Sequence, residues 1–226
     1  MDTTSKTMTL RNIFRKSLFT IPEIQRDYAW DAKKEVSKLL EDLWKYHTVT
    51  DKESHPHYFI GTIIVYESDE GGPLQIMDGQ QRISSLTCLL SAIKTILERY
   101  GIEAASKAEK KRLQRKAEKL EDDFLFEINK ADVTCKLIPK SEEANKVIRK
   151  MVQMDGENPD VAFAEKPGDV SGVRLLGALS YFFDELTILA NEKNSEDPLS
   201  EIEEFFKTLG NNVVATLTKT TTIGMA

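Results

Sequence analysis

The spacing of apolar side chains changes along the sequence between a pattern typical of strands and one typical of helices. Residues 58–66 are rich in β-branched and aromatic side chains, and a turn with two glycines separates them from a second apolar stretch at 74–77, which predicts a hairpin. Residues 83–97 repeat apolar side chains at helical spacing and predict a long helix with a buried face. The β-branched stretch 213–222 predicts another strand, whereas residues 1–20 show no clear period.

The rest of the chain alternates between predicted helices, short strands and loops. These are an extended segment at 18–22, a helix after Asp31 that buries 36–44, a charged helix at 104–122, strands at 124–128 and 133–138 around a polar turn at 129–132, a helix capped by Ser141 that carries 144–152, a long loop at 155–172, a helix at 173–190, and a helix that starts with a capping box at Ser200 and Glu203 and ends near Gly210. The expected fold class is α+β, with a strand-rich core at 1–100 and a mostly helical extension with short strands at 101–226 packed on it.

Composition narrows the class of protein. The 226 residues include 31 basic and 37 acidic side chains, and the net charge of −6 argues against a protein that coats nucleic acid nonspecifically. No apolar run approaches the ~18 residues of a membrane span, and no secretory signal pattern is present. Two cysteines, Cys88 and Cys135, are too few for a disulfide framework. We therefore expect a cytoplasmic protein that does not engage a membrane.

A local excess of basic side chains stands against this acidic background. Residues 107–119 hold seven basic and two acidic side chains. Several of the basic residues are four positions apart and repel one another mildly, so a solvated helix laced with ion pairs explains the run only in part. Contact with DNA or with a partner is the other interpretation.

The strongest local candidate for chemistry is Asp78-Gly79-Gln80-Gln81-Arg82, between the predicted strand and the long helix. The N-terminus of a helix presents unpaired N–H groups and a partial positive charge, which suit a phosphate. Gly79 lets a ligand approach the backbone, and Arg82 adds a charged fork for phosphate oxygens. Asp78 can hold a metal or orient a water, and the two glutamines can place a water. The alternative is a tight turn capped by Asp78, with Arg82 on the surface.

A second candidate lies earlier in the chain. Gln25, Arg26, Tyr28 and Trp30 bring an amide, a guanidinium group and two aromatic rings together before a predicted helix. Arginine interleaved with aromatic side chains suits contact with a nucleotide base or with a nucleic-acid backbone. The alternative is that the two aromatic rings anchor the helix in the core.

Three segments in this order resemble a known family. They are Ile21-Pro22-Glu23-Ile24-Gln25-Arg26-Asp27-Tyr28-Ala29-Trp30, then Tyr58-Phe59-Ile60-Gly61-Thr62-Ile63, then Ile76-Met77-Asp78-Gly79-Gln80-Gln81-Arg82-Ile83. Together they resemble the N-terminal domain of GmrSD-type restriction proteins, which act on modified DNA. The resemblance implies a ParB/sulfiredoxin-like fold for the N-terminal core. Weaker likenesses extend it over nearly the whole chain.

The resemblance also implies an activity and a set of site residues. It implies a domain that binds and hydrolyses a nucleoside triphosphate (NTP) with Mg²⁺ and couples this to restriction of modified phage DNA. The residues expected to act are Asp78, Gln80, Gln81 and Arg82 in catalysis, with Asp78 as the metal ligand; Gln25, Arg26, Gly61, Gly79 and Arg82 in nucleotide binding; and Arg26, Tyr28 and Trp30 in DNA contact.

The resemblance places DNA cutting elsewhere, in an HNH-type nuclease domain of a longer chain or in a partner subunit, since the 226 residues carry no such motif. Self-association of the chain stays open. Two other functions also stay open: a module that reads modified DNA without turnover, and a ParB-like nuclease. Asp78 has few acidic neighbours in the sequence, which does not favour a two-metal nuclease site.

Overall fold

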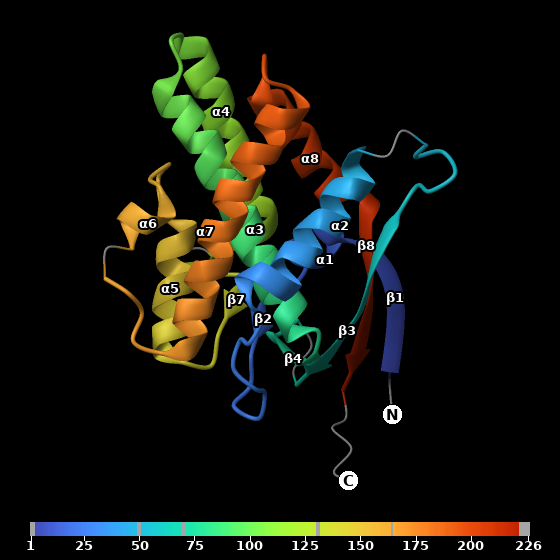
Figure 1. Ribbon diagram of the computed structural model, residues 1–226. Helices are drawn as coiled ribbons and strands as arrows, with labels where there is room; N and C mark the ends of the chain where they lie inside the picture. Colours follow the sequence, from blue (N-terminus) through green and yellow to red (C-terminus); the bar gives the residue numbers. More distant parts are fainter. Residues whose placement is uncertain (1–2, 49–50, 69–70, 130–131, 164, 222–226) are drawn as a thin grey trace.

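The computed structural model describes residues 3–48, 51–68, 71–129, 132–163 and 165–221 (Figure 1). Its centre is a mixed sheet with the strand order β1-β8-β3-β4-β2-β7. The pairs β1/β8 and β3/β4 are antiparallel, and β8/β3, β4/β2 and β2/β7 are parallel. These strands are β1 (Thr3–Thr9), β2 (Phe19–Thr20), β3 (Tyr58–Glu67), β4 (Leu74–Asp78), β7 (Leu137–Ile138) and β8 (Val213–Thr220), and a separate antiparallel pair comprises β5 (Phe126–Asn129) and β6 (Asp132–Cys135).

Helices form the other half of the molecule and gather around one long central helix (Figure 1). They are α1 (Leu10–Arg15), α2 (Ser37–Thr48), α3 (Gln80–Glu103), α4 (Lys107–Leu120), α5 (Glu142–Val152), α6 (Pro159–Ala162), α7 (Val170–Lys193) and α8 (Pro198–Asn212). π-Helical turns precede α2 (η1, Ala32–Val36) and follow α4 (η2, Glu121–Leu125). The central helix is α3, which packs against α4 and α7 and is buried along almost its whole length.

The burial of α3 determines where its first turn lies. Ile83, Leu86, Leu90, Ile93 and Leu97 are each at most 2% exposed and belong to one continuous core. Because α3 follows β4 after a single residue, the sheet and this core together position the N-terminal turn. The part of the sequence expected to carry chemistry therefore lies on a rigid support.

The α+β class and most predicted elements are confirmed. The hairpin of β3 and β4, the helices α3, α5 and α7, and the strand β8 occur where the periodicity predicts them. The caps at Asp31 and Ser141 are also present: Asp31 Oδ1 accepts from the Lys33 amide at 2.9 Å, and Ser141 Oγ accepts from the Ala144 amide at 3.0 Å. Strands β7 and β8 come from beyond residue 100 and pair with strands from before it.

Several local predictions are wrong. Residues 1–20 show no period in the sequence but contain β1 and α1, whereas β2 confirms the extended segment expected at 18–22. The predicted strand at 124–128 starts as the turn η2, the segment 133–138 is divided between β6 and β7, and the predicted loop at 155–172 contains α6 and the start of α7. The N-cap of α8 is Asp197 and not Ser200, because Asp197 Oδ1 accepts from the Ser200 amide at 3.1 Å. Residues 130, 131 and 222 of the predicted turn and last strand lie outside the described residues.

Candidate functional site

The turn between β4 and α3 depends on a glycine. Gly79 is the N-cap of α3 and has a φ of +92°, a backbone conformation that disfavours any residue with a Cβ atom. A Cβ atom there would also lie 3.3 Å from Ile63 Cα on the neighbouring strand β3. The neighbouring Asp78 side chain is 64% exposed at the end of β4. The turn thus brings a carboxylate beside the N–H groups of the first turn of α3.

The Arg82 side chain lies across the end of β3. Its Nη1 donates to the Ile60 carbonyl oxygen at 3.0 Å, and its Nη2 is 3.8 Å from Asp78 Oδ2. A Cβ atom at Gly61 would overlap Arg82 Nη1, and Gly61 has a φ of +106°. The register of β3 against β8 also shifts between Phe59 and Thr62. Gly61 therefore allows the Arg82 guanidinium to approach the strand closely.

Hydrogen bonds join the loop of residues 22–30 to the end of β4 and the start of α3. Gln25 Nε2 donates to the Met77 carbonyl oxygen at 2.8 Å, and Gln80 Nε2 donates to the Arg26 carbonyl oxygen at 2.9 Å. Gln80 Oε1 is buried and has no hydrogen-bond donor among the described residues. The two sequence motifs, about fifty positions apart, therefore contact each other directly.

Gln81 uses both ends of its side-chain amide to hold the same loop. Its Oε1 accepts from the backbone amides of Ala29 at 2.7 Å and Trp30 at 3.2 Å, and its Nε2 donates to the Asp27 carbonyl oxygen at 3.2 Å. Both acceptor positions of Oε1 and one of the two Nε2 hydrogens thus engage backbone groups. This geometry makes Gln81 a positioning residue for the loop.

The two motifs together line a cleft of about 180 Å³. Arg26 is exposed, and its guanidinium has no hydrogen bond or ion pair within the described part of the chain. Two arginine side chains and the N-terminal turn of α3 therefore border the same small space, which favours an anionic ligand. The lining residues are Gln25, Arg26, Trp30, Asp78, Gly79, Gln80, Gln81 and Arg82.

Tyr28 does not border this cleft and is only 2% exposed. Its hydroxyl lies 2.7 Å from Ser85 Oγ, and its backbone amide donates to Ser171 Oγ at 2.9 Å. Burial raises the pKa of its phenol well above the ordinary value. The predicted DNA contact at Tyr28 is therefore wrong, and the alternative that this ring anchors the segment in the core applies. Trp30, by contrast, is half-buried and borders the cleft.

Two basic side chains that the sequence analysis did not identify also hold the loop. Lys140 Nζ donates to the Gln25 carbonyl oxygen at 2.7 Å and lies 3.1 Å from Asp27 Oδ1. Arg174 Nη1 donates to the Ala29 carbonyl oxygen. Both residues are more than a hundred positions from the loop, and neither belongs to a motif, so no local signal in the sequence could have identified them.

The cleft fits a metal ion only when a bound phosphate group supplies further ligands beside Asp78. Among the described residues, no group of three or more His, Cys, Asp or Glu side chains could hold a metal ion. Asp78 is the single carboxylate among the residues that line the cleft. Mg²⁺ is commonly bound by one or two carboxylates together with substrate phosphates and waters, so Asp78 fits an ion that arrives with a phosphate chain. The cleft is smaller than the ~300 Å³ of an ordinary small-molecule pocket.

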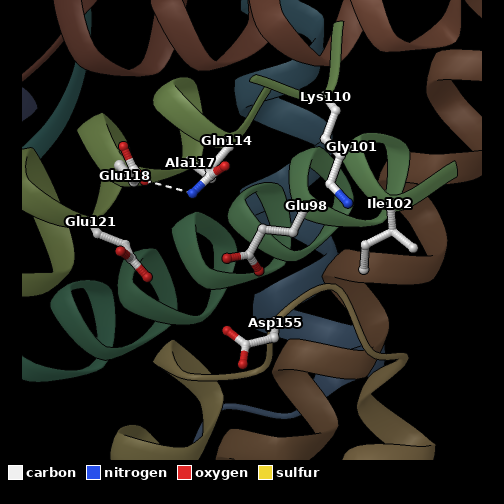
Figure 2. Close-up of a pocket in the computed structure, with 9 residues that line it drawn as sticks. All are labelled: Glu98, Gly101, Ile102, Lys110, Gln114, Ala117, Glu118, Glu121 and Asp155. Carbon is white, nitrogen blue, oxygen red and sulfur yellow. Dashed lines mark hydrogen bonds between the residues drawn. The ribbon is translucent and has the colours of Figure 1, made fainter. Parts of the chain in front are cut away.

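A larger cavity of about 400 Å³ lies elsewhere, between α3, α4 and the segment at Asp155 (Figure 2). Four carboxylates line it, and none of its residues belongs to either sequence motif. An acidic lining repels phosphates, so this cavity does not compete with the cleft as a nucleotide site. Its lining residues are Glu98, Gly101, Ile102, Lys110, Gln114, Ala117, Glu118, Glu121 and Asp155.

Residues 9–220 match the family model described as the N-terminal domain of the GmrSD restriction endonuclease. No curated protein matches the sequence. Within the described part of the chain, no helix has both the length and the apolar character needed to cross a membrane.

Proposed function

Because the chain belongs to the family of the GmrSD restriction endonuclease N-terminal domain, we propose that it binds and hydrolyses an NTP and so regulates the restriction of modified phage DNA. The same proposal assigns a ParB/sulfiredoxin-like fold to its N-terminal core. One observation carries the proposal. Two motifs from separate parts of the sequence meet at the N-terminus of α3, where two arginine side chains border one cleft.

Three groups of the chain bind the phosphates in this proposal. The N–H groups of the first turn of α3 point out of the helix end and carry its partial positive charge. Arg82, held by the Ile60 carbonyl oxygen, offers its remaining N–H groups to phosphate oxygens. Arg26, whose guanidinium has no partner inside the described chain, also borders the cleft. The cleft size suits the phosphate chain, with the nucleoside outside and Trp30 beside it.

The remaining polar side chains orient the reacting groups. Asp78 would hold Mg²⁺ together with the phosphates, and the ion would neutralise charge on the transferring phosphoryl group. In this proposal Asp78 accepts a hydrogen bond from the attacking water, and Gln80 positions Arg26 by donating to its carbonyl oxygen. Gln81 and Gln25 keep the loop at the correct distance from α3. Catalysis then rests on positioning and on charge stabilisation, as in other phosphoryl transfers.

DNA and a nuclease complete the proposed system. Arg26 and Trp30 lie at the border of the cleft, where modified DNA could bias hydrolysis. Hydrolysis would then license an HNH-type nuclease in another domain or in a partner subunit, in the cytoplasm.

Phosphate release tests this function. The chain is incubated with ATP, GTP, CTP or UTP and Mg²⁺, with modified or unmodified DNA, and compared with Asp78→Ala and Arg82→Ala. We expect release with at least one NTP and a loss of at least a hundredfold in both variants. Both variants should still unfold in one cooperative transition, with an unchanged melting temperature in Asp78→Ala and a small decrease in Arg82→Ala, which loses its hydrogen bond to the Ile60 carbonyl oxygen. Glu192→Ala removes an exposed carboxylate outside the cleft and should keep full activity. Activity that persists in both cleft variants would refute the assignment.

The single carboxylate supports a second candidate, a module that binds nucleotide and modified DNA without turnover. In that case nucleotide binding would depend on Arg82, but no phosphate would be released. The third candidate, a ParB-like nuclease, gains no support from the described residues, which contain no cluster of metal-binding side chains. Metal-dependent nicking of DNA by this chain would support the nuclease candidate.

A further inference from the structure

We propose that the outer face of α4 binds the phosphate backbone of duplex DNA. This face, here called the α4 stripe, consists of Lys107, Lys111, Arg115 and Lys119, which lie four positions apart. All four are exposed, and none of these side chains has a hydrogen bond or an ion pair among the described residues. In Figure 1, α4 stands at the end of the molecule away from the sheet.

Repulsion between the charges of the α4 stripe lowers the stability of the helix. A solvated helix face with mixed charges avoids this repulsion. Like charges four positions apart destabilise a helix, each pair by about 0.2–0.5 kcal/mol. Elsewhere the same chain places opposite charges at this spacing, as in the pairs Lys38–Asp42 at 2.7 Å and Arg99–Glu103 at 3.3 Å. Four cations in a row, in a chain with a net charge of −6, therefore indicate a surface arranged for an anion.

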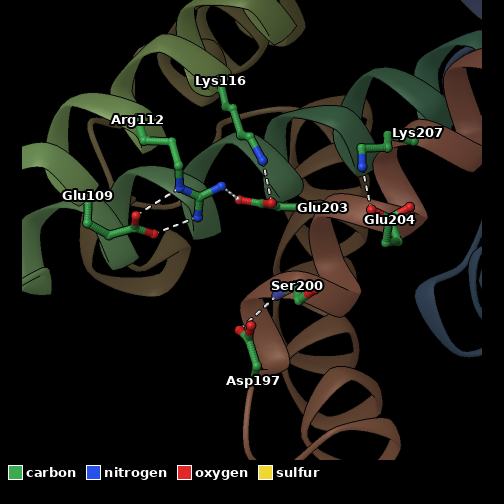
Figure 3. Close-up of polar contacts among 8 residues, drawn as sticks. All are labelled: Glu109, Arg112, Lys116, Asp197, Ser200, Glu203, Glu204 and Lys207. Carbon is green, nitrogen blue, oxygen red and sulfur yellow. Dashed lines mark hydrogen bonds and ion pairs between the residues drawn. The ribbon is translucent and has the colours of Figure 1, made fainter.

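Two basic side chains on another face of α4 form ion pairs with carboxylates of the protein itself (Figure 3). Arg112 Nη1 donates to Glu203 Oε1 of α8 at 2.7 Å, and Lys116 forms an ion pair with the same carboxylate. Glu109, one turn before, accepts two hydrogen bonds from Arg112. These contacts join α4 to α8 and hold the stripe in a defined orientation. The basic run is thus divided into a structural part and an unpaired part.

Acidic side chains border the stripe and limit how an anion can approach. Glu118 and Glu121 lie on the α4 side of the acidic cavity, opposite Glu98 and Asp155 (Figure 2). Glu203 lies beside α4 on the other flank (Figure 3). A polyanion that moves from the stripe toward the cavity meets carboxylates, whereas the cations on the other flank are already paired with Glu109 and Glu203. Duplex DNA fits this arrangement, because it is stiff and regularly charged and can contact the outward face of α4 alone.

The dimensions of the stripe fit duplex DNA. Twelve residues separate Lys107 from Lys119, which is about 18 Å along a helix. One strand of duplex DNA rises 3.4 Å per phosphate, so the stripe spans roughly five phosphates. The chain belongs to a restriction endonuclease family, which acts on DNA; the inference rests on this part of the proposed function and not on nucleotide hydrolysis.

The α4 stripe is separate from the cleft. Glu121, just after α4, lies 3.0 Å from Lys94 of α3, and about 18 Å of helix separates Lys94 from Arg82 in the first turn. DNA bound at the stripe therefore leaves the cleft free for nucleotide. Binding at the stripe and hydrolysis in the cleft can accordingly be measured independently.

Fluorescence anisotropy with a labelled 30-base-pair duplex, without nucleotide and over a range of salt concentrations, tests this proposal. The test variant changes all four stripe residues to Gln, which retains helix propensity. The matched control changes Lys33, Lys45, Lys166 and Lys193 to Gln, which removes the same charge from exposed sites on other elements. We expect the test variant to bind the duplex about thirtyfold or more weakly at 0.1 M salt. The slope of log affinity against log salt concentration should become shallower by about three to four, because that many fewer ions are released on binding. The control should stay within about threefold of wild type.

Several outcomes would overturn the proposal. These are a wild-type chain that does not bind the duplex, a test variant that binds as well as the control, and a stripe that prefers an acidic peptide or RNA to duplex DNA. If the fourfold variant fails to fold, the pairs Lys107→Gln/Lys111→Gln and Arg115→Gln/Lys119→Gln should each remove about half of the salt dependence. Stripe-dependent DNA binding without phosphate release would refute only the NTPase proposal.

Discussion

Gly61 of β3 lies directly against the guanidinium group of Arg82, so that a Cβ atom at position 61 would overlap Arg82 Nη1. The Ile60 carbonyl oxygen holds the same nitrogen at 3.0 Å. A strand from one motif thus determines where the cation of another motif lies. This contact explains why a glycine stands within a strand that is otherwise rich in β-branched and aromatic residues.

Gly61→Ala should impair both stability and ligand binding. The substitution places a Cβ atom at a φ of +106° and displaces Arg82 from the Ile60 carbonyl oxygen. We expect a loss of about 1–2 kcal/mol in the free energy of unfolding from the backbone alone. We also expect nucleotide affinity to fall at least tenfold. Chemical denaturation and nucleotide titration measure the two effects.

Gly71→Ala separates backbone strain from the displacement of Arg82. Gly71 also has a positive φ, of +77°, but no atom lies within 4 Å of a Cβ built on it. The control variant should lose similar stability and keep its nucleotide affinity. Equal losses of affinity in the two variants would mean that strain, and not the position of Arg82, accounts for the effect.

Trp30 should report nucleotide binding by its fluorescence. The chain has two tryptophans. Trp30 borders the cleft, whereas Trp44 is 8% exposed and packs against Phe205 with a ring-centroid distance of 4.9 Å. We expect NTP addition to change the emission of wild type and of Trp44→Phe, and to leave Trp30→Phe unchanged. A response that survives in Trp30→Phe would place the ligand outside the cleft.

Lys140 is expected to act as a positioning residue. Lys140→Met removes the hydrogen bond to the Gln25 carbonyl oxygen and the ion pair with Asp27. We expect a loss of about 1–2 kcal/mol of stability, together with a raised KM for NTP and a nearly unchanged kcat. Lys140→Arg should restore part of the affinity. Lys146→Met, which removes an exposed lysine paired within α5, should change stability by less than about 0.5 kcal/mol and leave KM unchanged.

His47 should make the protein less stable as the pH falls through the range in which histidine titrates. His47 Nε2 lies 2.9 Å from Glu201 Oε1, and Nδ1 lies 3.0 Å from Thr208 Oγ1. Burial lowers the pKa of His47 below its usual value, and Glu201 opposes this only in part. Because the unfolded chain then binds more protons than the folded chain, stability rises with pH in the window below about 6.5.

The melting temperature at pH 7.5 and pH 5.5 checks this prediction. The decrease at pH 5.5 should be smaller in His47→Gln, which cannot take up a proton. His55→Gln changes an exposed histidine and should behave as wild type does. A decrease of the same size in His47→Gln would assign the pH dependence to other groups.

The two motifs illustrate how far sequence reasoning reaches toward the candidate site. The turn from Asp78 to Arg82 was predictable, because a strand, a glycine and a helix start follow one another within a few residues. Its meeting with Gln25 and Arg26 followed only from a resemblance to a family. The roles within the cleft were not predictable, since the engagement of Gln81 and the burial of Tyr28 depend on contacts between the loop and α3, about fifty positions apart in the sequence.

The fold class, the hairpin of β3 and β4, the main helices and the position of the glycine turn could all be predicted from local patterns in the sequence. Periodicity, turn residues and caps act between residues only a few positions apart, so they can be read along the chain. The tertiary structure alone decided that β1 pairs with β8, from Thr3 with Thr220 to Thr9 with Val214, and that Lys140 and Arg174 hold the loop. Such contacts join positions more than a hundred residues apart, and no local pattern specifies them, because the energy that selects them comes from burial and pairing in the assembled core.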